Sequence, residues 1–222
     1  MTLAQTINGR LRSVPAWPIY IAGLTYAVWL VWQGASGALG VDGVKMLEYR
    51  VGKAGLQLLL LGLLITPLRK FTGISLIRFR RTVGLLAFGY IVLHLSIWLT
   101  LDLQLRWGEI WADIRKRPYI TIGMLAFLAM IPLAVTSNNL SVRRLGAAAW
   151  QRLHLLTYPA AALGTLHYVM LNKTWAKQPV FYVSVLIVLL ALRLWWARGR
   201  VLPPSTRTPS TGAVRGYMPP ID

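Results

Sequence analysis

Long apolar runs, separated by short polar segments, make up most of the chain. A helix needs about 20 residues to cross the hydrocarbon core of a bilayer, and roughly 17 to 25 are tolerated. Six runs meet or nearly meet this length: residues 17–34, 51–68, 82–101, 118–136, 153–171 and 179–197. The pattern therefore predicts an all-α integral membrane protein, built as a bundle of six transmembrane helices.

The composition agrees with a membrane protein and excludes some kinds of site. Only 14% of the residues are charged, whereas a soluble domain has about 25%. The chain has no Cys, which excludes disulfides and metal sites held by thiolates. The net charge of +18 would suit nucleic acid, but the charges form short clusters between apolar runs, as in membrane loops. We therefore expect the chain to contact a lipid bilayer and no nucleic acid.

The distribution of Lys and Arg predicts the orientation in the membrane. If the N-terminus is cytoplasmic, the cytoplasmic segments hold 15 basic residues and the opposite side holds nine, in the sense of the positive-inside rule. We expect both termini in the cytoplasm. Residues 1–16 would form an N-terminal tail, residues 17–200 the six-helix membrane domain, and residues 201–222 a disordered tail rich in Pro, Ser, Thr and Gly.

All three histidines fall within or at the ends of apolar runs. His94 lies in the third run and His167 in the fifth, at a similar depth. His154 precedes His167 by 13 residues, or roughly 20 Å along a helix. Two imidazoles at one depth on different helices suit the two axial positions of one haem iron. Two alternatives stay open: hydrogen bonds that fix helix packing, or a proton relay.

Other residues near the histidines fit a haem site but have simpler explanations. The segment RFRRT at 78–82 carries Arg78, Arg80 and Arg81, which would pair with haem propionates or with a flavin phosphate. An ordinary positive-inside loop is the alternative. Three glycines would let a macrocycle approach the backbone, or would permit close helix packing: Gly84, Gly89 and Gly164.

Five segments carry a resemblance to a known family. They are LLITPLRK at 63–70, RRTVGLLAFGYIVLHL at 80–95, RPYITIGMLAF at 117–127, LAVTS at 133–137 and RRLGAAAWQRLHLLTYPAAALGTLHYV at 143–169. Together they resemble the MsrQ family, the haem-binding membrane subunits of bacterial periplasmic methionine sulfoxide reductase systems. The family belongs to a broader group of ferric-reductase-like transmembrane proteins that includes NADPH oxidases. The resemblance covers about residues 20–198, and the last segment is its most specific part.

The resemblance implies an electron-transfer subunit rather than the catalytic subunit of an oxidoreductase system. It implies b-type haem held by histidines of the third and fifth helices, and His94, His154 and His167 match the family's haem-associated histidines. It also implies FMN. Electrons would come from the quinone pool, as quinol, or from a cytosolic flavin reductase. They would pass to a periplasmic molybdopterin-containing enzyme that reduces methionine sulfoxide in proteins, across the bacterial inner membrane.

The chain departs from the NADPH oxidases at a point that bears on the number of haems. Those proteins usually hold two haems with four histidines, two on each of two helices. Here the third helix offers only His94, and 13 or 14 residues earlier stands Arg81 or Arg80. We therefore expect one haem toward the outer side, with His94 and His167 as axial ligands, and leave a second open. His154 would help to bind flavin, quinone or haem in another way.

Two other functions fit parts of the sequence. Histidines in apolar helices also suit a proton or small-solute transporter without haem, which would have helices broken at mid-membrane. A structural assembly factor would keep its activity when a histidine is replaced. The charged stretch at 102–117 would dock the periplasmic partner, or it is a solvated loop.

Overall fold

The computed structural model describes residues 3–172 and 177–198, and all of their regular structure is helical. The helices are α1 (Leu3–Ser13), α2 (Trp17–Ala35), α3 (Gly43–Thr72), α4 (Arg80–Ile97), α5 (Trp107–Lys116), α6 (Pro118–Val135), α7 (Asn139–Leu145), α8 (Ala147–Leu153), α9 (Thr157–Leu171) and α10 (Lys177–Arg198). Short irregular turns of helix cover Ile77–Phe79, Trp98–Asp102 and His154–Leu156. The all-α prediction is confirmed.

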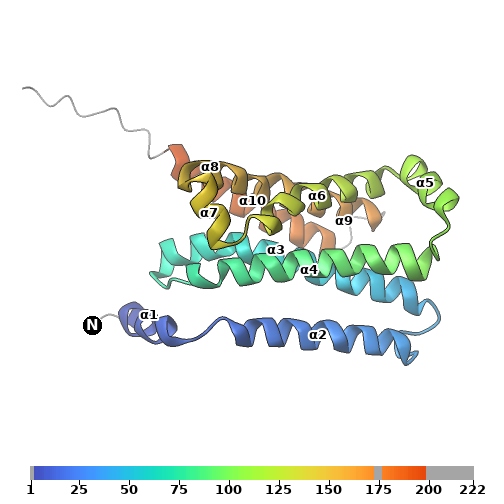
Figure 1. Ribbon diagram of the computed structural model, residues 1–222, viewed down its shortest axis with the longest axis horizontal. Coiled ribbons are helices and arrows are strands. Elements are labelled where there is room, and N and C mark those ends of the chain that lie inside the picture. Colours follow the sequence, from blue (N-terminus) through green and yellow to red (C-terminus); the bar gives the residue numbers. More distant parts are fainter. Residues whose placement is uncertain (1–2, 173–176, 199–222) are drawn as a thin grey trace, which may run out of the picture.

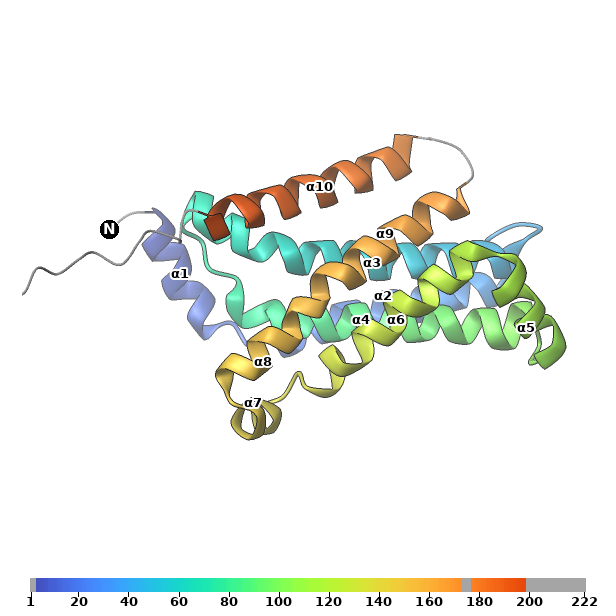
Figure 2. The ribbon, with the colours of Figure 1, turned by 90° about the horizontal axis from the view of Figure 1, so that it is seen from above.

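The long helices are arranged side by side in three layers (Figure 1). Helix α2 forms one layer and packs on α3 and α4, which form the second. Helices α6, α9 and α10 form the third, in which α9 contacts both α6 and α10. The view from above shows α9 crossing the bundle between α6 and α10 (Figure 2). Helices α4 and α9 therefore both lie inside the bundle, and each contacts both α3 and α6.

Within residues 3–172 and 177–198, four helical segments are long and apolar enough to cross a membrane: Gly43–Thr72, Ile77–Asp102, Pro118–Val135 and Lys177–Arg198. Helices α1 and α2 make a fifth when taken together, although a bend of 76° separates them. Many large apolar side chains on the outside of the bundle are exposed, far more than the small patches that a soluble monomer leaves open. The chain is therefore a multi-pass membrane protein, and the count of six spans stays a prediction.

Helix α3 is longer than its apolar run. It begins at Gly43 instead of residue 51, because residues 44–50 contain no Pro or Gly that would end a helix. It ends at Gly73, whose φ of +74° lies in the left-handed region and whose N–H donates to the carbonyl oxygen of Arg69. The added first turns carry Lys45 and Glu48, and both line the cavity described below.

The fifth predicted span is interrupted. Residues His154–Leu156 form a turn of 310-helix between α8 and α9, so α9 itself has only 15 residues. Pro159 follows this turn, and its missing N–H leaves the carbonyl of Leu155 without the usual helical donor. The proline therefore accounts for the break at this point, and His154 and His167 do not lie on one regular helix.

Small residues let the inner helices approach each other. Ala160 and Ala161 of α9 and Ala87 of α4 are completely buried, in a cluster with leucines of α3 and α10. A second cluster joins α2 to α3 and α4 around Leu30 and Val51, which are also completely buried. The two clusters fix α3 and α4 between the outer layers, and thereby fix the position of the helix that carries His94.

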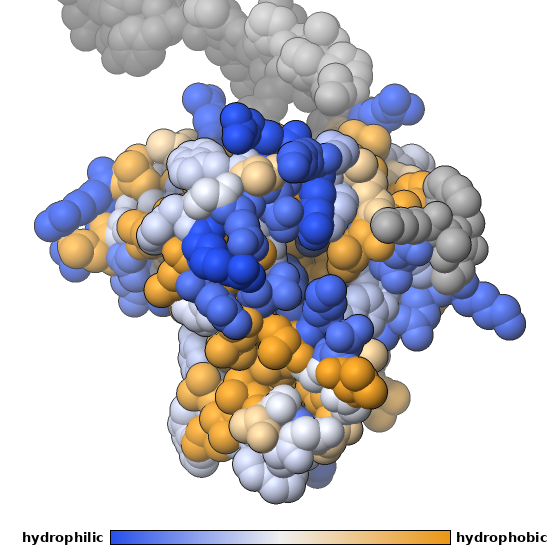
Figure 3. All heavy atoms as spheres, turned by 90° about the vertical axis from the view of Figure 1, so that its right-hand side faces the viewer, coloured by the Kyte–Doolittle hydropathy of each residue, from blue (hydrophilic) through white to orange (hydrophobic). Residues whose placement is uncertain are grey.

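The two ends of the bundle collect different segments. At one end lie α1, the turn Ile77–Phe79, α7 and α8, and at the other lie α5 and the connection between α2 and α3 (Figure 1). The α5 end presents hydrophilic residues above and apolar residues around α2 below (Figure 3). The N-terminal segment, predicted as a tail, contains α1. The predicted disordered tail, residues 201–222, lies outside the described residues.

Candidate functional site

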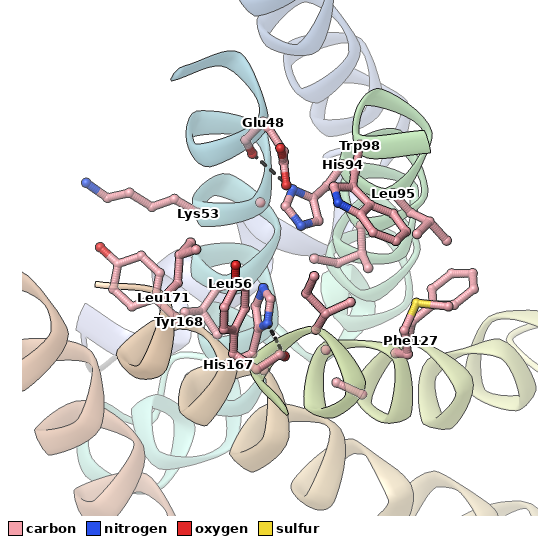
Figure 4. A pocket seen from close by; sticks show the side chains of 18 of the residues that line it. Glu48, Lys53, Leu56, His94, Leu95, Trp98, Phe127, His167, Tyr168 and Leu171 are labelled. Carbon is pink, nitrogen blue, oxygen red and sulfur yellow. Dashed lines mark hydrogen bonds between the residues drawn. The ribbon is translucent and has the colours of Figure 1, made fainter. Parts of the chain in front are cut away.

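A cavity of about 420 Å³ lies between α3, α4, α6 and α9, in the half of the bundle nearer to α5. Its size falls within the range of about 300–1,000 Å³ that is usual for ligand sites. Its walls are mainly apolar and include Leu56, Trp98 and Phe127 (Figure 4). Charged residues also line it: Lys45, Glu48, Lys53, Asp102 and Arg117. The cavity is therefore an apolar chamber with a charged end toward α5.

His94 and His167 face each other across this cavity (Figure 4). The centroids of their rings are 6.2 Å apart, and the ring planes make an angle of 74°. His94 comes from α4 and His167 from α9. The structure thus brings together the two histidines that the sequence placed at one depth on different helices.

Hydrogen bonds to backbone carbonyls hold both rings in place. Nδ1 of His94 lies 3.0 Å from the carbonyl oxygen of Glu48, and Nδ1 of His167 lies 2.7 Å from that of Tyr119. A carbonyl oxygen can only accept, so each Nδ1 carries the hydrogen and donates it. The other nitrogen, Nε2, is then an acceptor with a free lone pair. Figure 4 shows that this second nitrogen of each ring points toward the other histidine.

The separation of the rings fits one metal ion bound between them. With metal–nitrogen bonds of about 2 Å and a ring nitrogen about 1.1 Å from the centroid, two opposed imidazoles have centroids about 6.2 Å apart. The observed separation is 6.2 Å. A metal held by protein alone usually needs three or four side-chain ligands, and the described residues contain no group of three His, Cys, Asp or Glu that could supply them. Two neutral imidazoles on opposite sides suit a haem iron, whose remaining ligands belong to the macrocycle.

His154 has different surroundings. It lies in the turn before α9, where its ring stacks on that of Trp150 with centroids 3.8 Å apart. Its Nε2 lies 3.1 Å from Oγ1 of Thr136, and Trp150 Nε1 donates to the carbonyl oxygen of Thr136. It does not line the cavity. The structure therefore separates His154 from the pair formed by His94 and His167.

The three arginines of the RFRRT segment lie at the start of α4, at the end of the bundle opposite α5. Arg78 donates to the carbonyl oxygens of Leu11 and Arg12, and so holds α1 against the turn before α4. Arg81 donates to Oδ1 of Asn139 at 2.8 Å. Arg80 is near enough to His154 to act on it electrostatically. None of the three lines the cavity.

The charged stretch at 102–117 forms α5 and its flanks. Arg106 pairs with Glu109 at 2.7 Å and Arg117 pairs with Asp113 at 3.3 Å. Trp107 and Trp111 are exposed on the same helix. The stretch is therefore more ordered than an open loop, and it adjoins the charged end of the cavity through Arg117.

Several residues of this site were not predicted from the sequence. The glycines expected near a macrocycle were Gly84, Gly89 and Gly164, of which only Gly164 lines the cavity. The glycines that contact the histidine rings are Gly52 and Gly123. Each stands inside an apolar run that faces a histidine-bearing helix, at the depth of the histidine. That combination is the signal that the sequence offered.

Comparison with known proteins shows the family of the chain. The family model described as ferric reductase like transmembrane component matches residues 51–165. A protein from Caulobacter vibrioides is 45% identical over 181 residues, which are 81% of this chain and 86% of that protein. Proteins from Brucella anthropi and Brucella ovis are 43% and 44% identical over 191 residues, or 86% of each chain. All three are named protein-methionine-sulfoxide reductase heme-binding subunit MsrQ.

The chain belongs to the MsrQ family. The segment that matches the ferric reductase model contains His94 and His154 and ends two residues before His167. It also contains Tyr119, whose carbonyl accepts from His167, but it begins three residues after Glu48, whose carbonyl accepts from His94. Most residues that line the cavity of this MsrQ family member thus lie within the part that the broader group shares, and the first turns of α3 and the end of α9 lie outside it.

Proposed function

We propose that this chain is a b-type haem-binding subunit that transfers electrons across the bacterial inner membrane to a periplasmic, molybdopterin-containing protein-methionine-sulfoxide reductase. The names of the relatives support the haem and the reductase. One observation carries the proposal. His94 and His167 oppose each other at 6.2 Å with both Nδ1 atoms bonded to carbonyls, which leaves two Nε2 lone pairs for one iron.

His94 and His167 would hold the iron of one haem. When bound, the haem supplies reversible one-electron exchange between ferric and ferrous iron. Lys45, Lys53 and Arg117 stand at the charged end of the cavity and would pair with the propionates. Arg80 and Arg81 begin the helix that carries His94 fourteen and thirteen residues later, about 20 Å away, so they would serve another group.

The walls of the cavity would keep water away and hold the ligands rigid. Leu56, Trp98 and Phe127 present apolar surface to the space between the imidazoles. Ligands whose rings are already hydrogen-bonded need little rearrangement when the iron changes charge. The charged end toward α5 would face the periplasm and the reductase, and α5 would form part of the docking surface.

The opposite end would receive the electrons. It carries Arg78, Arg80 and Arg81 together with His154 and Trp150, and the arginines would bind the phosphate of FMN. The donor would be the quinone pool or a cytosolic flavin reductase. In this arrangement six spans place both termini in the cytoplasm, as the positive-inside rule requires. His154 would contribute to the flavin, the quinone or a second haem.

The test is the reduced-minus-oxidised visible spectrum of purified protein, with pyridine haemochrome quantification. We expect about one haem per chain, lost in His94→Ala and in His167→Ala and kept in the matched control His154→Ala. A colourless protein after haem-replete expression would refute the proposal and favour the histidine-relay transporter. Haem that survives both His94→Ala and His167→Ala would refute the assignment of the ligands.

A further inference from the structure

Each histidine of the cavity packs against a glycine on a neighbouring helix. A Cβ atom added to Gly52 of α3 would lie 2.8 Å from Nδ1 of His94 and 3.0 Å from its Cε1. A Cβ atom added to Gly123 of α6 would lie 2.8 Å from Nδ1 of His167 and 3.1 Å from its Cε1. Real Cβ atoms are essentially never found this close to other heavy atoms. Neither ring can hold its position against any residue other than glycine.

The same two glycines stand in a fixed relation to the carbonyls that hold the rings. His94 donates to the carbonyl of Glu48, four residues before Gly52, and His167 donates to that of Tyr119, four residues before Gly123. In an α-helix the carbonyl of residue i accepts from the N–H of residue i+4. A side chain at i+4 leans back over that carbonyl. Its absence lets the imidazole reach the second lone pair of the oxygen.

We propose that Gly52 and Gly123 are positioning residues, which open two helix carbonyls to the Nδ1–H groups of His94 and His167 and so aim both Nε2 atoms into the cavity. The proposal rests on the function proposed above, in which these two Nε2 atoms bind one haem iron. The same arrangement of glycine, carbonyl and histidine occurs twice, once between α3 and α4 and once between α6 and α9. One change at either glycine would disturb one ligand and leave the other unchanged.

Close helix packing does not account for these glycines. Gly55, one turn further along α3, also lacks room for a Cβ atom, which would lie 2.7 Å from Cδ1 of Ile91. That methyl group ends a flexible side chain and can rotate away. At Gly52 and Gly123 the three nearest atoms all belong to an imidazole ring that a hydrogen bond already holds. At these two positions, the group that leaves no room for a Cβ atom is therefore the histidine ring.

The carbonyl bond also bears on the electronic properties of the ligand. Donation from Nδ1–H to a carbonyl raises the basicity of the opposite nitrogen, and such partners typically change metal affinity by about 10–100-fold. A more basic imidazole stabilises the ferric state and lowers the midpoint potential. Loss of the bond should therefore weaken haem binding and raise the midpoint potential of the haem that remains.

The experiment compares Gly52→Ala and Gly123→Ala with two controls on α3. Gly62→Ala meets only Val83 at 3.9 Å, and Gly55→Ala meets Ile91. We expect haem affinity to fall about 10–100-fold in Gly52→Ala and in Gly123→Ala, with an altered electron paramagnetic resonance signal and a raised midpoint potential in the haem that is retained. Gly62→Ala should match the wild type. Gly55→Ala should lower the melting temperature but keep the wild-type resonance signal.

A double variant distinguishes this role from a general need for glycine. If Gly52 only makes room for the ring, Gly52→Ala should cost nothing further once His94→Ala has removed the ring. We therefore expect Gly52→Ala/His94→Ala to accumulate and melt like His94→Ala, even if Gly52→Ala alone accumulates poorly. A double variant that is less stable than His94→Ala would overturn the proposal.

The proposal would also be overturned if both glycine variants had the haem affinity, resonance signal and midpoint potential of the wild type. That result would leave the assignment of the haem and its ligands unchanged. A wild type without haem, by contrast, would refute the proposed function itself. The two failures are therefore distinguishable in one set of samples.

Discussion

The two ends of the bundle use histidine in different ways. At the α5 end, His94 and His167 each donate a hydrogen bond from Nδ1–H to a helix carbonyl, and Nε2 points into the cavity. At the opposite end, His154 bonds Thr136 through Nε2 and stacks on Trp150. Histidines in similar apolar segments thus have two kinds of surroundings. Where a backbone carbonyl accepts from Nδ1–H, as for His94 and His167, Nε2 is left to bind a ligand.

The largest expected difference between the ends is the effect of replacing a histidine on haem binding. His167→Gly should lose the haem, because one axial bond disappears and the remaining imidazole holds the iron from one side only. Free imidazole added during reconstitution should restore a low-spin visible spectrum by occupying the space of the missing ring. His154→Gly should keep the spectrum without added imidazole. A His167→Gly protein that binds haem normally without imidazole would contradict the assignment.

A smaller difference is expected for the cations at each end. Lys53→Met and Arg117→Met each remove a charged partner for the propionates, and hydrogen bonds to charged groups contribute about 1.5–3 kcal/mol. We therefore expect haem affinity to fall roughly 10-fold or more, measured by titration of the apoprotein with haem.

Arg81→Met is the matched control at the other end. It should leave haem affinity unchanged and slow reduction by a flavin donor. Equal effects of Arg117→Met and Arg81→Met on haem affinity would contradict the proposal that one end binds the haem propionates and the other end binds the flavin.

Weakening the surroundings of His154 should affect stability and leave the haem unchanged. Thr136→Val removes the hydroxyl that lies 3.1 Å from Nε2 of His154, and a typical buried hydrogen bond contributes about 1 kcal/mol. We expect a slightly lower melting temperature in detergent with an unchanged haem spectrum. A changed spectrum would show that His154 takes part in binding the haem, against the proposed assignment.

The smallest effect is expected at the surface of α5. Arg106 and Glu109 form an exposed ion pair, and such pairs contribute about 0–1 kcal/mol. Glu109→Gln should leave the melting temperature nearly unchanged. If α5 docks the reductase, the substitution should instead change the rate of electron transfer to it and the dependence of that rate on salt. A rate independent of the substitution at all salt concentrations would place the docking surface elsewhere.

The sequence predicted the helices well because lipid imposes a simple pattern on them. It predicted the pairing of His94 with His167 because depth can be counted along two helices that run in the same direction. It did not predict that α3 would begin at Gly43, because a helix extends past its apolar run wherever nothing breaks it. The break in the fifth run lies at His154–Leu156, just before Pro159.

The atoms that hold the rings were beyond the reach of sequence patterns. The acceptors are backbone carbonyls, which every residue has, so neither Glu48 nor Tyr119 carries a signal of this role in its side chain. Gly52 and Gly123 matter through the side chain that they lack, and two other glycines of α3, Gly55 and Gly62, face aliphatic side chains instead. Depth in the apolar run points to Gly52 and Gly123, but the relative rotation of neighbouring helices decides which glycine meets a histidine ring, and packing sets that rotation.

The most direct test of the central claim is the electron paramagnetic resonance spectrum of the oxidised wild-type protein. His94 and His167 would both bind one ferric iron, and their ring planes stand at 74° to each other. We therefore expect a low-spin signal with the large anisotropy that near-perpendicular imidazole planes produce, lost in both His94→Ala and His167→Ala. A high-spin ferric signal in the wild type, or a low-spin signal that persists in either variant, would contradict it.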